Sequence, residues 1–231
     1  FIPIERGIIE GSPTGAQTLT EVLKWHVNRH PERTLIQFYS DFGEGEKISY
    51  GRLQSSALII AESLRLRGVE LNEPVAIILP TGAEYFYSFL GILYSGGVPV
   101  PLYPPARWRA LGDHIQRQKS ILRSCGARFL ITSTEGSGFM ANQKGHVGKL
   151  RYILTVENLL LSESPNVLPI ITAKDTALLQ YTSGSTGDPK GVVLTHSNLL
   201  NNVRTMGEAV DAKSSDIFIS WLPLYHDMGL I

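Results

Sequence analysis

The chain has 231 residues, and its 21 lysines and arginines balance 21 aspartates and glutamates. Nucleic acids and anionic membranes attract proteins with an excess of basic groups, so a net charge of zero argues against both as the main partner. With 43% hydrophobic and 18% charged residues, the composition excludes a disordered or fibrous chain and indicates a globular one.

Cys125 is the only cysteine, which excludes an intramolecular disulfide and a thiolate metal cluster. A single thiol fits a reducing compartment, so we expect a cytoplasmic location. The longest uncharged run covers residues 85–106 and contains Gly96, Gly97 and several prolines from Pro99 onward. This pattern predicts a buried helix, a turn and a strand rather than a membrane span.

Helical and strand-like patterns alternate along the chain. Thr18 and Glu21 have capping-box spacing ahead of apolar residues at helical intervals, which predicts a helix over 19–29. Strand-like runs at 35–40 and 47–50 flank a short loop with glycines and predict a hairpin. Further helices are predicted around 53–64 and over 83–95 and 109–124, and further strands over 75–79, 98–103, 128–133 and 152–156. Residues 135–148 are glycine-rich and weakly patterned, so we expect a loop with one helical turn.

This alternation assigns the chain to the α/β class, with mainly parallel sheets flanked by helices. Short continuous apolar runs such as 75–79 are typical of strands that are covered on both faces. A proline-bearing connector at 162–172 is a candidate boundary. We therefore expect a first α/β subdomain with the N-terminal hairpin over 1–165 and the start of a second α/β subdomain over 166–231.

Two strand-like runs bracket residues 182–191, Thr-Ser-Gly-Ser-Thr-Gly-Asp-Pro-Lys-Gly. Glycines let backbone amides converge on an anion, hydroxyls add donors, and Lys190 supplies a mobile positive charge. The run therefore predicts a cradle for a polyphosphate. The run is not a Walker loop, because that motif places the lysine after a glycine and before a serine or threonine, whereas Lys190 follows Pro189 and precedes Gly191. The alternative is a flexible surface hairpin made of ordinary turn residues.

Residues 181–191, Tyr-Thr-Ser-Gly-Ser-Thr-Gly-Asp-Pro-Lys-Gly, resemble the phosphate-loop signature of the adenylate-forming superfamily of acyl-CoA synthetases, peptide-synthetase adenylation domains and luciferases. Two further segments resemble its fatty acyl-AMP ligase branch: 98–105, Val-Pro-Val-Pro-Leu-Tyr-Pro-Pro, and 221–231, Trp-Leu-Pro-Leu-Tyr-His-Asp-Met-Gly-Leu-Ile. The resemblance runs from about Thr18 to Ile231. It implies the fold of the leading part of the large N-terminal domain of such an enzyme.

The resemblance implies ATP-dependent activation of a fatty acid to an acyl-adenylate, with Mg²⁺ as the companion of ATP and with release of pyrophosphate. In this branch the acyl group then passes to the thiol of an acyl carrier protein or of a carrier domain of a polyketide or peptide synthase. A long-chain acyl-CoA ligase and a non-catalytic binding module are the alternatives. Because family members carry further elements downstream of the matched part, we expect these 231 residues to have little or no adenylation activity alone.

The resemblance also assigns the site. Nucleotide binding is expected from Thr182, Ser183, Gly184, Ser185, Thr186, Gly187, Lys190 and Gly191, and catalysis from Lys190 and His226. His226 matches the histidine between acyl tunnel and α-phosphate, where an imidazole would orient the reacting carboxylate. The alternative is that His226 and Asp227 end a strand and pair only with each other. Trp221 and Met228 are expected to pack rather than to contact a ligand, and no metal ligand is assigned.

Overall fold

The computed structural model describes residues 9–40, 43–105, 112–142, 147–161, 167–182 and 189–230. In chain order its elements are α1 (Leu19–Val27), β1 (Thr34–Ser40), β2 (Gly43–Ser49), α2 (Tyr50–Leu66), β3 (Pro74–Ile78), α3 (Ala83–Ser95), β4 (Val98–Pro101), α4 (Gly112–Cys125), β5 (Phe129–Thr132), α5 (Thr134–Ala141), β6 (Tyr152–Thr155), α6 (Val156–Leu159), β7 (Thr176–Thr182), β8 (Lys190–Thr195), α7 (His196–Ala209) and α8 (Asp227–Leu230). Among them, no helix combines the length and the apolar composition that a bilayer crossing requires.

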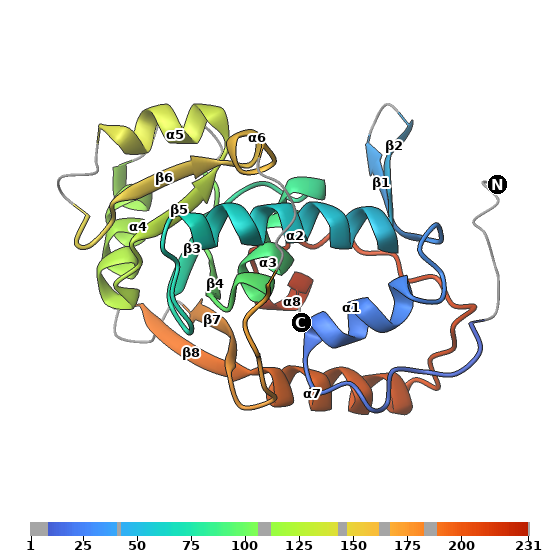
Figure 1. Ribbon diagram of the computed structural model, residues 1–231. Helices are drawn as coiled ribbons and strands as arrows, with labels where there is room; N and C mark the ends of the chain where they lie inside the picture. Colours follow the sequence, from blue (N-terminus) through green and yellow to red (C-terminus); the bar gives the residue numbers. More distant parts are fainter. Residues whose placement is uncertain are drawn as a thin grey trace.

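The centre of the fold is a four-stranded parallel sheet in the order β4-β3-β5-β6 (Figure 1). Strands β1 and β2 form a separate antiparallel hairpin, and β7 and β8 form a second one. Helices connect the parallel strands, as βαβ crossovers require. The predicted α/β class is therefore confirmed.

Both faces of the parallel sheet are covered. Along β3, the fully buried Val75 and Ile77 belong to a core that also contains residues of α2 and α3. The alternate residues, Ala76 and Ile78, are equally buried and belong to a second core with residues of α4 and α5. Because successive side chains of a strand point to opposite faces, this arrangement explains why the strand is apolar throughout.

Most predicted elements are observed, but β2 begins at Gly43, inside the loop predicted for the hairpin, and ends at Ser49, while α7 was not predicted. Helix α3 has the predicted bounds, whereas α1 ends at Val27, two residues before the predicted end. The predicted loop over 135–148 was wrong, because α5 forms two helical turns there. The side chain of Ser133 accepts a hydrogen bond from Gly136 N at 3.2 Å and caps this helix, and Met140 is fully buried in the core. Capping and packing thus outweigh the low helix propensity of glycine.

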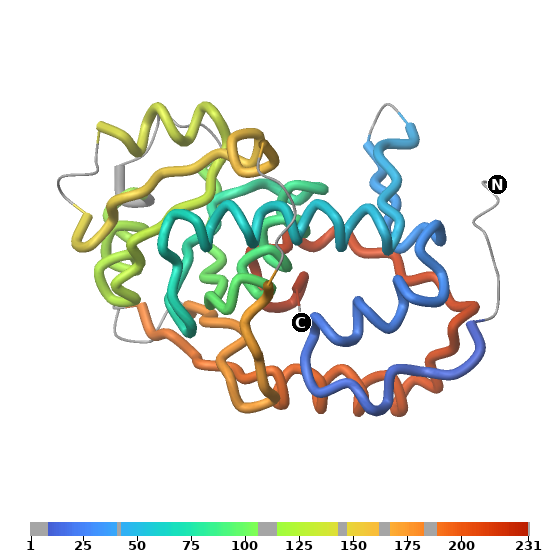
Figure 2. The backbone as a smooth tube through the Cα atoms, in the orientation of Figure 1, coloured from blue at the N-terminus to red at the C-terminus, as the bar shows by residue number. Residues whose placement is uncertain are grey.

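The segment before α1 runs alongside α7 (Figure 2). The guanidinium of Arg204 on α7 donates hydrogen bonds to the carbonyls of Pro13, Thr14 and Ala16, the shortest being 2.7 Å to Ala16. At the start of α7, Nδ1 of His196 accepts a hydrogen bond from the backbone N–H of Leu19 at 3.2 Å. The N-terminal segment is therefore fixed to the helix that follows the β7–β8 hairpin.

His196 makes the stability of this packing depend on pH. Its side chain is only 1% exposed, and burial lowers its pKa from 6.5 to about 4, against the opposing carboxylates of Asp175 and Glu21. The unfolded state binds the proton more tightly than the folded state. The contribution of neutral His196 to the free energy of unfolding is therefore fully present above about pH 6.5 and decreases by about 3 kcal/mol as the pH falls towards 4. Urea unfolding at pH 7 and at pH 4.5 measures this loss.

The variant His196→Asn supplies the control for this prediction. An amide oxygen can accept the hydrogen bond of Leu19 N but does not titrate, so the variant should lose less stability between the two pH values than the unmodified protein. Burial also lowers the pKa of His26, which therefore adds to the loss of stability at acid pH in both proteins alike. An identical loss in variant and unmodified protein would contradict the role given to His196.

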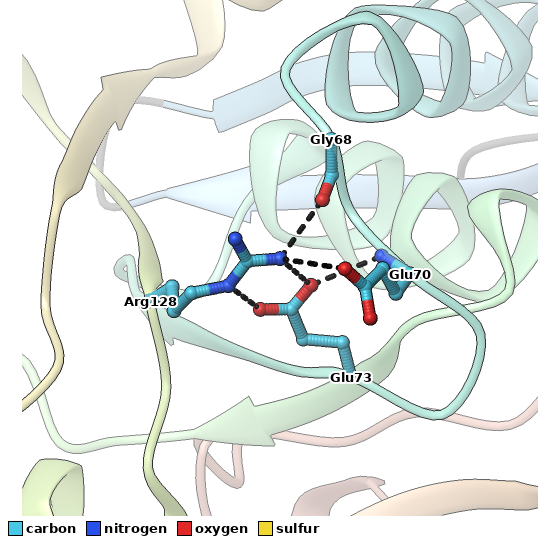
Figure 3. A network of polar contacts seen from close by, with 4 residues as sticks. All are labelled: Gly68, Glu70, Glu73 and Arg128. Carbon is cyan, nitrogen blue, oxygen red and sulfur yellow. Dashed lines mark hydrogen bonds and ion pairs between the residues drawn. The ribbon is translucent and has the colours of Figure 1, made fainter.

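A network of charged groups joins the starts of β3 and β5 (Figure 3). Arg128 donates two hydrogen bonds to the carboxylate of Glu73, at 2.5 and 2.7 Å, and a third to the carbonyl of Gly68 at 2.9 Å. A more exposed carboxylate, that of Glu70, lies 3.7 Å from the same guanidinium. The Glu73 side chain is only 11% exposed and the Arg128 side chain 28%, so the carboxylate is largely shielded from water. The two hydrogen bonds hold the pair in bidentate geometry.

We expect Arg128→Ala to destabilise the protein by about 2 kcal/mol, because it leaves a largely buried carboxylate without its partner. Arg52→Ala is the matched control. Arg52 also pairs with a glutamate, Glu46, at 2.6 Å, but both side chains are at least 40% exposed, so its loss should cost less than about 1 kcal/mol. Denaturant midpoints of the two variants measure the difference, and equal shifts would count against the role of the network.

Candidate nucleotide-binding and acyl-activating site

The β7–β8 hairpin carries the predicted phosphate loop. Its strands pair in antiparallel register, with Tyr181 opposite Gly191 and Thr182 opposite Lys190. Thr182 and Lys190 are both exposed and form the last cross-strand pair before the turn. The two predicted strands around the loop are therefore confirmed. Five predicted binding residues lie outside the described part of the chain: Ser183, Gly184, Ser185, Thr186 and Gly187.

Gly191 has a packing role near the loop end of this hairpin. A Cβ atom added to it would lie 3.0 Å from Cδ1 of Leu179 and 3.1 Å from Cζ of Tyr181. The tyrosine ring thus occupies the space that any side chain at position 191 would need. This close approach holds the two strands together one pair before Thr182 and Lys190.

The segment that contains His226 is attached to the carboxyl ends of the parallel strands. Leu224 N donates a hydrogen bond to Oγ1 of Thr81, just after β3, at 3.2 Å. The carbonyl of Leu224 accepts a hydrogen bond of 2.8 Å from the buried hydroxyl of Tyr85, in the first turn of α3. In open α/β sheets, ligands bind at this edge. The segment is therefore placed where the fold class puts its sites.

Tyr103, which follows β4, joins the two segments that resemble the fatty acyl-AMP ligase branch. Its ring lies 4.9 Å from the ring of Tyr225 and 6.2 Å from that of His226, in an edge-on arrangement. The carbonyl of Tyr103 accepts a hydrogen bond from Gln118 of α4 at 2.5 Å. Residues 98–105 and 221–230 are thus brought together, although more than a hundred residues separate them in the sequence.

His226 pairs locally with its neighbour but keeps one nitrogen for a ligand. Its Nδ1 lies 2.5 Å from Oδ1 of Asp227, which also accepts a hydrogen bond from Met228 N at 2.9 Å. Met228 N also lies 3.3 Å from Nδ1, so both local contacts engage this nitrogen and fix the ring, and Nε2 has no hydrogen-bond partner among the described residues. The side chain of His226 is 42% exposed. The residue follows a turn and precedes α8, so it does not end a strand as the alternative interpretation expected.

Sequence reasoning erred on two residues of this segment and missed others. Trp221 is 89% exposed and Met228 is 71% exposed, so the expectation that both pack is wrong in this chain. The contacts of Thr81, Tyr85 and Tyr103 were not predicted. Two signals could have suggested Tyr103: it lies in the segment 98–105 that resembles the fatty acyl-AMP ligase branch, and it follows a buried apolar strand.

The described residues do not connect the hairpin directly with His226. Among them, no hydrogen bond or ion pair joins Thr182 or Lys190 to residues 221–230. In Figure 1 the end of the hairpin where β7 stops and β8 starts lies apart from α8. A ligand that contacts both the hairpin end and His226 must therefore be an extended one.

The described part of the chain contains no group of three His, Cys, Asp or Glu side chains that could hold a metal ion.

A helix-covered parallel sheet, an exposed lysine near the loop end of a two-stranded hairpin and a histidine at the carboxyl edge of the sheet are the arrangement of a nucleotide-binding α/β protein. The chain belongs to the family of AMP-binding enzymes, whose profile matches residues 23–231. This match covers most of the chain and includes both the hairpin and His226.

Curated relatives are similar along almost the whole chain. The chain is 32% identical to the long-chain-fatty-acid–AMP ligase FadD26 of Mycobacterium tuberculosis, over 95% of this chain and 39% of the relative. It is 31% identical to the 4-hydroxyphenylalkanoate adenylyltransferase of Mycobacterium marinum, over 100% of this chain and 38% of the relative. The chain therefore spans less than two fifths of the length of these relatives.

Solved structures agree with this assignment. A fatty acyl-adenylate ligase from L. pneumophila, in complex with acyl adenylate and pyrophosphate, superimposes with a TM-score of 0.82 at 28% identity, over 97% of this chain and 38% of the ligase. The adenylation domain of a keto acid-selecting peptide synthetase module shares the fold, with a TM-score of 0.83 at 22% identity, over 96% of this chain and 42% of that one.

Proposed function

We propose that the whole protein activates a fatty acid with ATP, giving an acyl-adenylate and pyrophosphate. The observation that carries this proposal is the exposed pair of Thr182 and Lys190 at the turn of the β7–β8 hairpin, in a chain whose relatives include fatty-acid–AMP ligases. A lysine and hydroxyls with glycines between them suit the negative charge of a triphosphate.

In the proposed reaction, an oxygen of the fatty acid carboxylate forms a bond to the α-phosphorus of ATP. The bond between this phosphorus and the bridging oxygen breaks, and pyrophosphate leaves with the electron pair. Lys190, Thr182 and the hydroxyls and amides of residues 183–187 would stabilise the charge that gathers on the leaving group. His226, held by Asp227, would orient the carboxylate through Nε2. A carboxylate is already ionised near pH 7, so no base is needed.

ATP and Mg²⁺ are part of the same proposal. Mg²⁺ would enter with the phosphates of ATP and reduce their negative charge. We assign no metal ligand among the described residues, which hold no group of three His, Cys, Asp or Glu side chains that could bind a metal ion. We also include a cytoplasmic location in the proposal, and it rests on the lone thiol of Cys125.

We propose an acyl carrier protein, or a carrier domain of a polyketide or peptide synthase, as the acceptor of the acyl group. The similarity to fatty acyl-AMP ligases supports this acceptor. The competing acceptor is coenzyme A, since one relative at 32% identity is a putative acyl-CoA synthetase.

Product analysis tests the proposal. The whole protein is incubated with ATP, Mg²⁺ and a long-chain fatty acid, together with either coenzyme A or a holo-carrier protein. We expect fatty-acid-dependent pyrophosphate release and acylation of the carrier but not of coenzyme A. Rapid formation of acyl-CoA would favour the acyl-CoA ligase, and absence of pyrophosphate release would favour a non-catalytic binding module.

A further inference from the structure

Tyr181 is the last buried residue of β7 before the predicted phosphate loop. Its side chain is 7% exposed and belongs to the core between the parallel sheet and α4. The neighbouring Thr182 is exposed. Since side chains alternate along a strand, Tyr181 points into the fold while Thr182 and its partner Lys190 point away from it.

Two contacts fix the ring of Tyr181. Its hydroxyl donates a hydrogen bond of 2.8 Å to Oγ of Ser124, in the last turn of α4. The other contact is with the position opposite, where a Cβ on Gly191 would lie 3.1 Å from Cζ of the ring. The ring is therefore close to the second strand of the hairpin and is hydrogen-bonded to α4.

These contacts act at a specific point of the hairpin. The pair of Tyr181 and Gly191 comes directly before the pair of Thr182 and Lys190. A two-stranded hairpin has little stability of its own, and its direction depends on what it packs against. A displacement of the ring from α4 would therefore move Thr182 and Lys190, which are proposed to bind phosphate.

We propose that Tyr181 is a positioning residue, which sets the place of Thr182 and Lys190 by attaching the loop end of the β7–β8 hairpin to Ser124 of α4. The inference rests on the proposed function, because it assumes that the turn binds the phosphates of ATP. It adds that the affinity for ATP depends on a hydrogen bond to α4, which lies outside the residues proposed to bind phosphate.

A double-mutant cycle in the whole protein tests this inference. Tyr181→Phe, Ser124→Ala and the combined variant are compared in fatty-acid-dependent ATP–pyrophosphate exchange. Each single variant should raise the KM for ATP about fivefold, as expected for loss of one hydrogen bond. In the combined variant the KM for ATP should also rise about fivefold. Two independent effects would multiply to roughly 25-fold, but both substitutions remove the same interaction. The KM for the fatty acid should stay unchanged.

Tyr94→Phe is the matched control. The hydroxyl of Tyr94 also hydrogen-bonds inside the fold, to Thr20 O at 3.2 Å, but on α3 and away from the hairpin. It should lower the melting temperature without changing the KM for ATP. Should Tyr181→Phe fail to fold, Ser124→Ala removes the same hydrogen bond from an exposed serine.

The outcomes are distinguishable. An unchanged KM for ATP in both Tyr181→Phe and Ser124→Ala, with only a lower melting temperature, would show that the contact serves stability alone and would overturn the inference while leaving the proposed function standing. A wild-type protein that binds no ATP in a direct titration would overturn the proposed function and the inference together.

Discussion

Replacement of Lys190 by alanine should slow fatty-acid-dependent ATP–pyrophosphate exchange of the whole protein by about 10²–10³-fold, the usual effect of removing one donor that stabilises charge in a transition state. Lys190 is exposed at the first position of β8 and lies opposite Thr182. Its removal should therefore leave the fold intact while depriving the leaving pyrophosphate of its positive partner.

Lys47→Ala is the control for this prediction. Lys47 also lies on a strand of a two-stranded hairpin and is exposed, where it pairs with Glu44 at 3.4 Å. We expect wild-type exchange rates from it. Melting temperatures of both variants confirm that they are folded. If Lys190→Ala exchanged pyrophosphate at the rate of Lys47→Ala, the hairpin would not be the phosphate site.

Replacement of Gly229 by alanine should have an effect of similar size for a different reason. A Cβ on Gly229 would lie 2.2 Å from the carbonyl oxygen of Pro223. This oxygen also accepts a hydrogen bond of 3.1 Å from His226 N. Since backbone cannot yield as a flexible side chain can, the turn over 223–229 must open, and the imidazole of His226 must move.

We expect the Gly229→Ala variant to lose about 10²-fold in the rate of acyl-adenylate formation, because misplacement of an orienting group by about 1 Å has this cost. Gly138→Ala is the matched control: Gly138 also lies in a helix, α5, and an added Cβ would have no atom within 4 Å. It should retain full activity. Equal activities of the two variants would argue against the positioning of His226 by this turn.

The fold could be predicted from the sequence wherever local signals and burial agree. Helix α3 was predicted within its exact bounds, because its apolar residues end at Gly96, which adopts a φ of 85° that favours glycine. Helix α5 could not be predicted, because its glycines disfavour a helix and only the surrounding core reveals why Met140 must be buried.

Some residues of the candidate site could be predicted from local sequence, whereas others depend on contacts made only in the fold. The hydroxyls and Lys190 of the hairpin form one contiguous motif, so their residue types alone indicate phosphate chemistry. The contacts of Tyr103 with His226 and of Tyr181 with Ser124 join residues that are distant in sequence. No pattern in one sequence encodes such pairs, because they arise only when the sheet and its helices are packed. The exposure of Trp221 likewise depends on the folded chain.

The central claim is that the turn of the β7–β8 hairpin holds the triphosphate of ATP while a fatty acid carboxylate is presented near His226. A crystal structure of the whole protein with a non-hydrolysable ATP analogue and a fatty acid tests it most directly. The account predicts phosphate oxygens within hydrogen-bond distance of Lys190, Thr182 and the backbone of residues 183–187. Phosphates bound at any other part of the molecule, with the hairpin turn unoccupied, would contradict it.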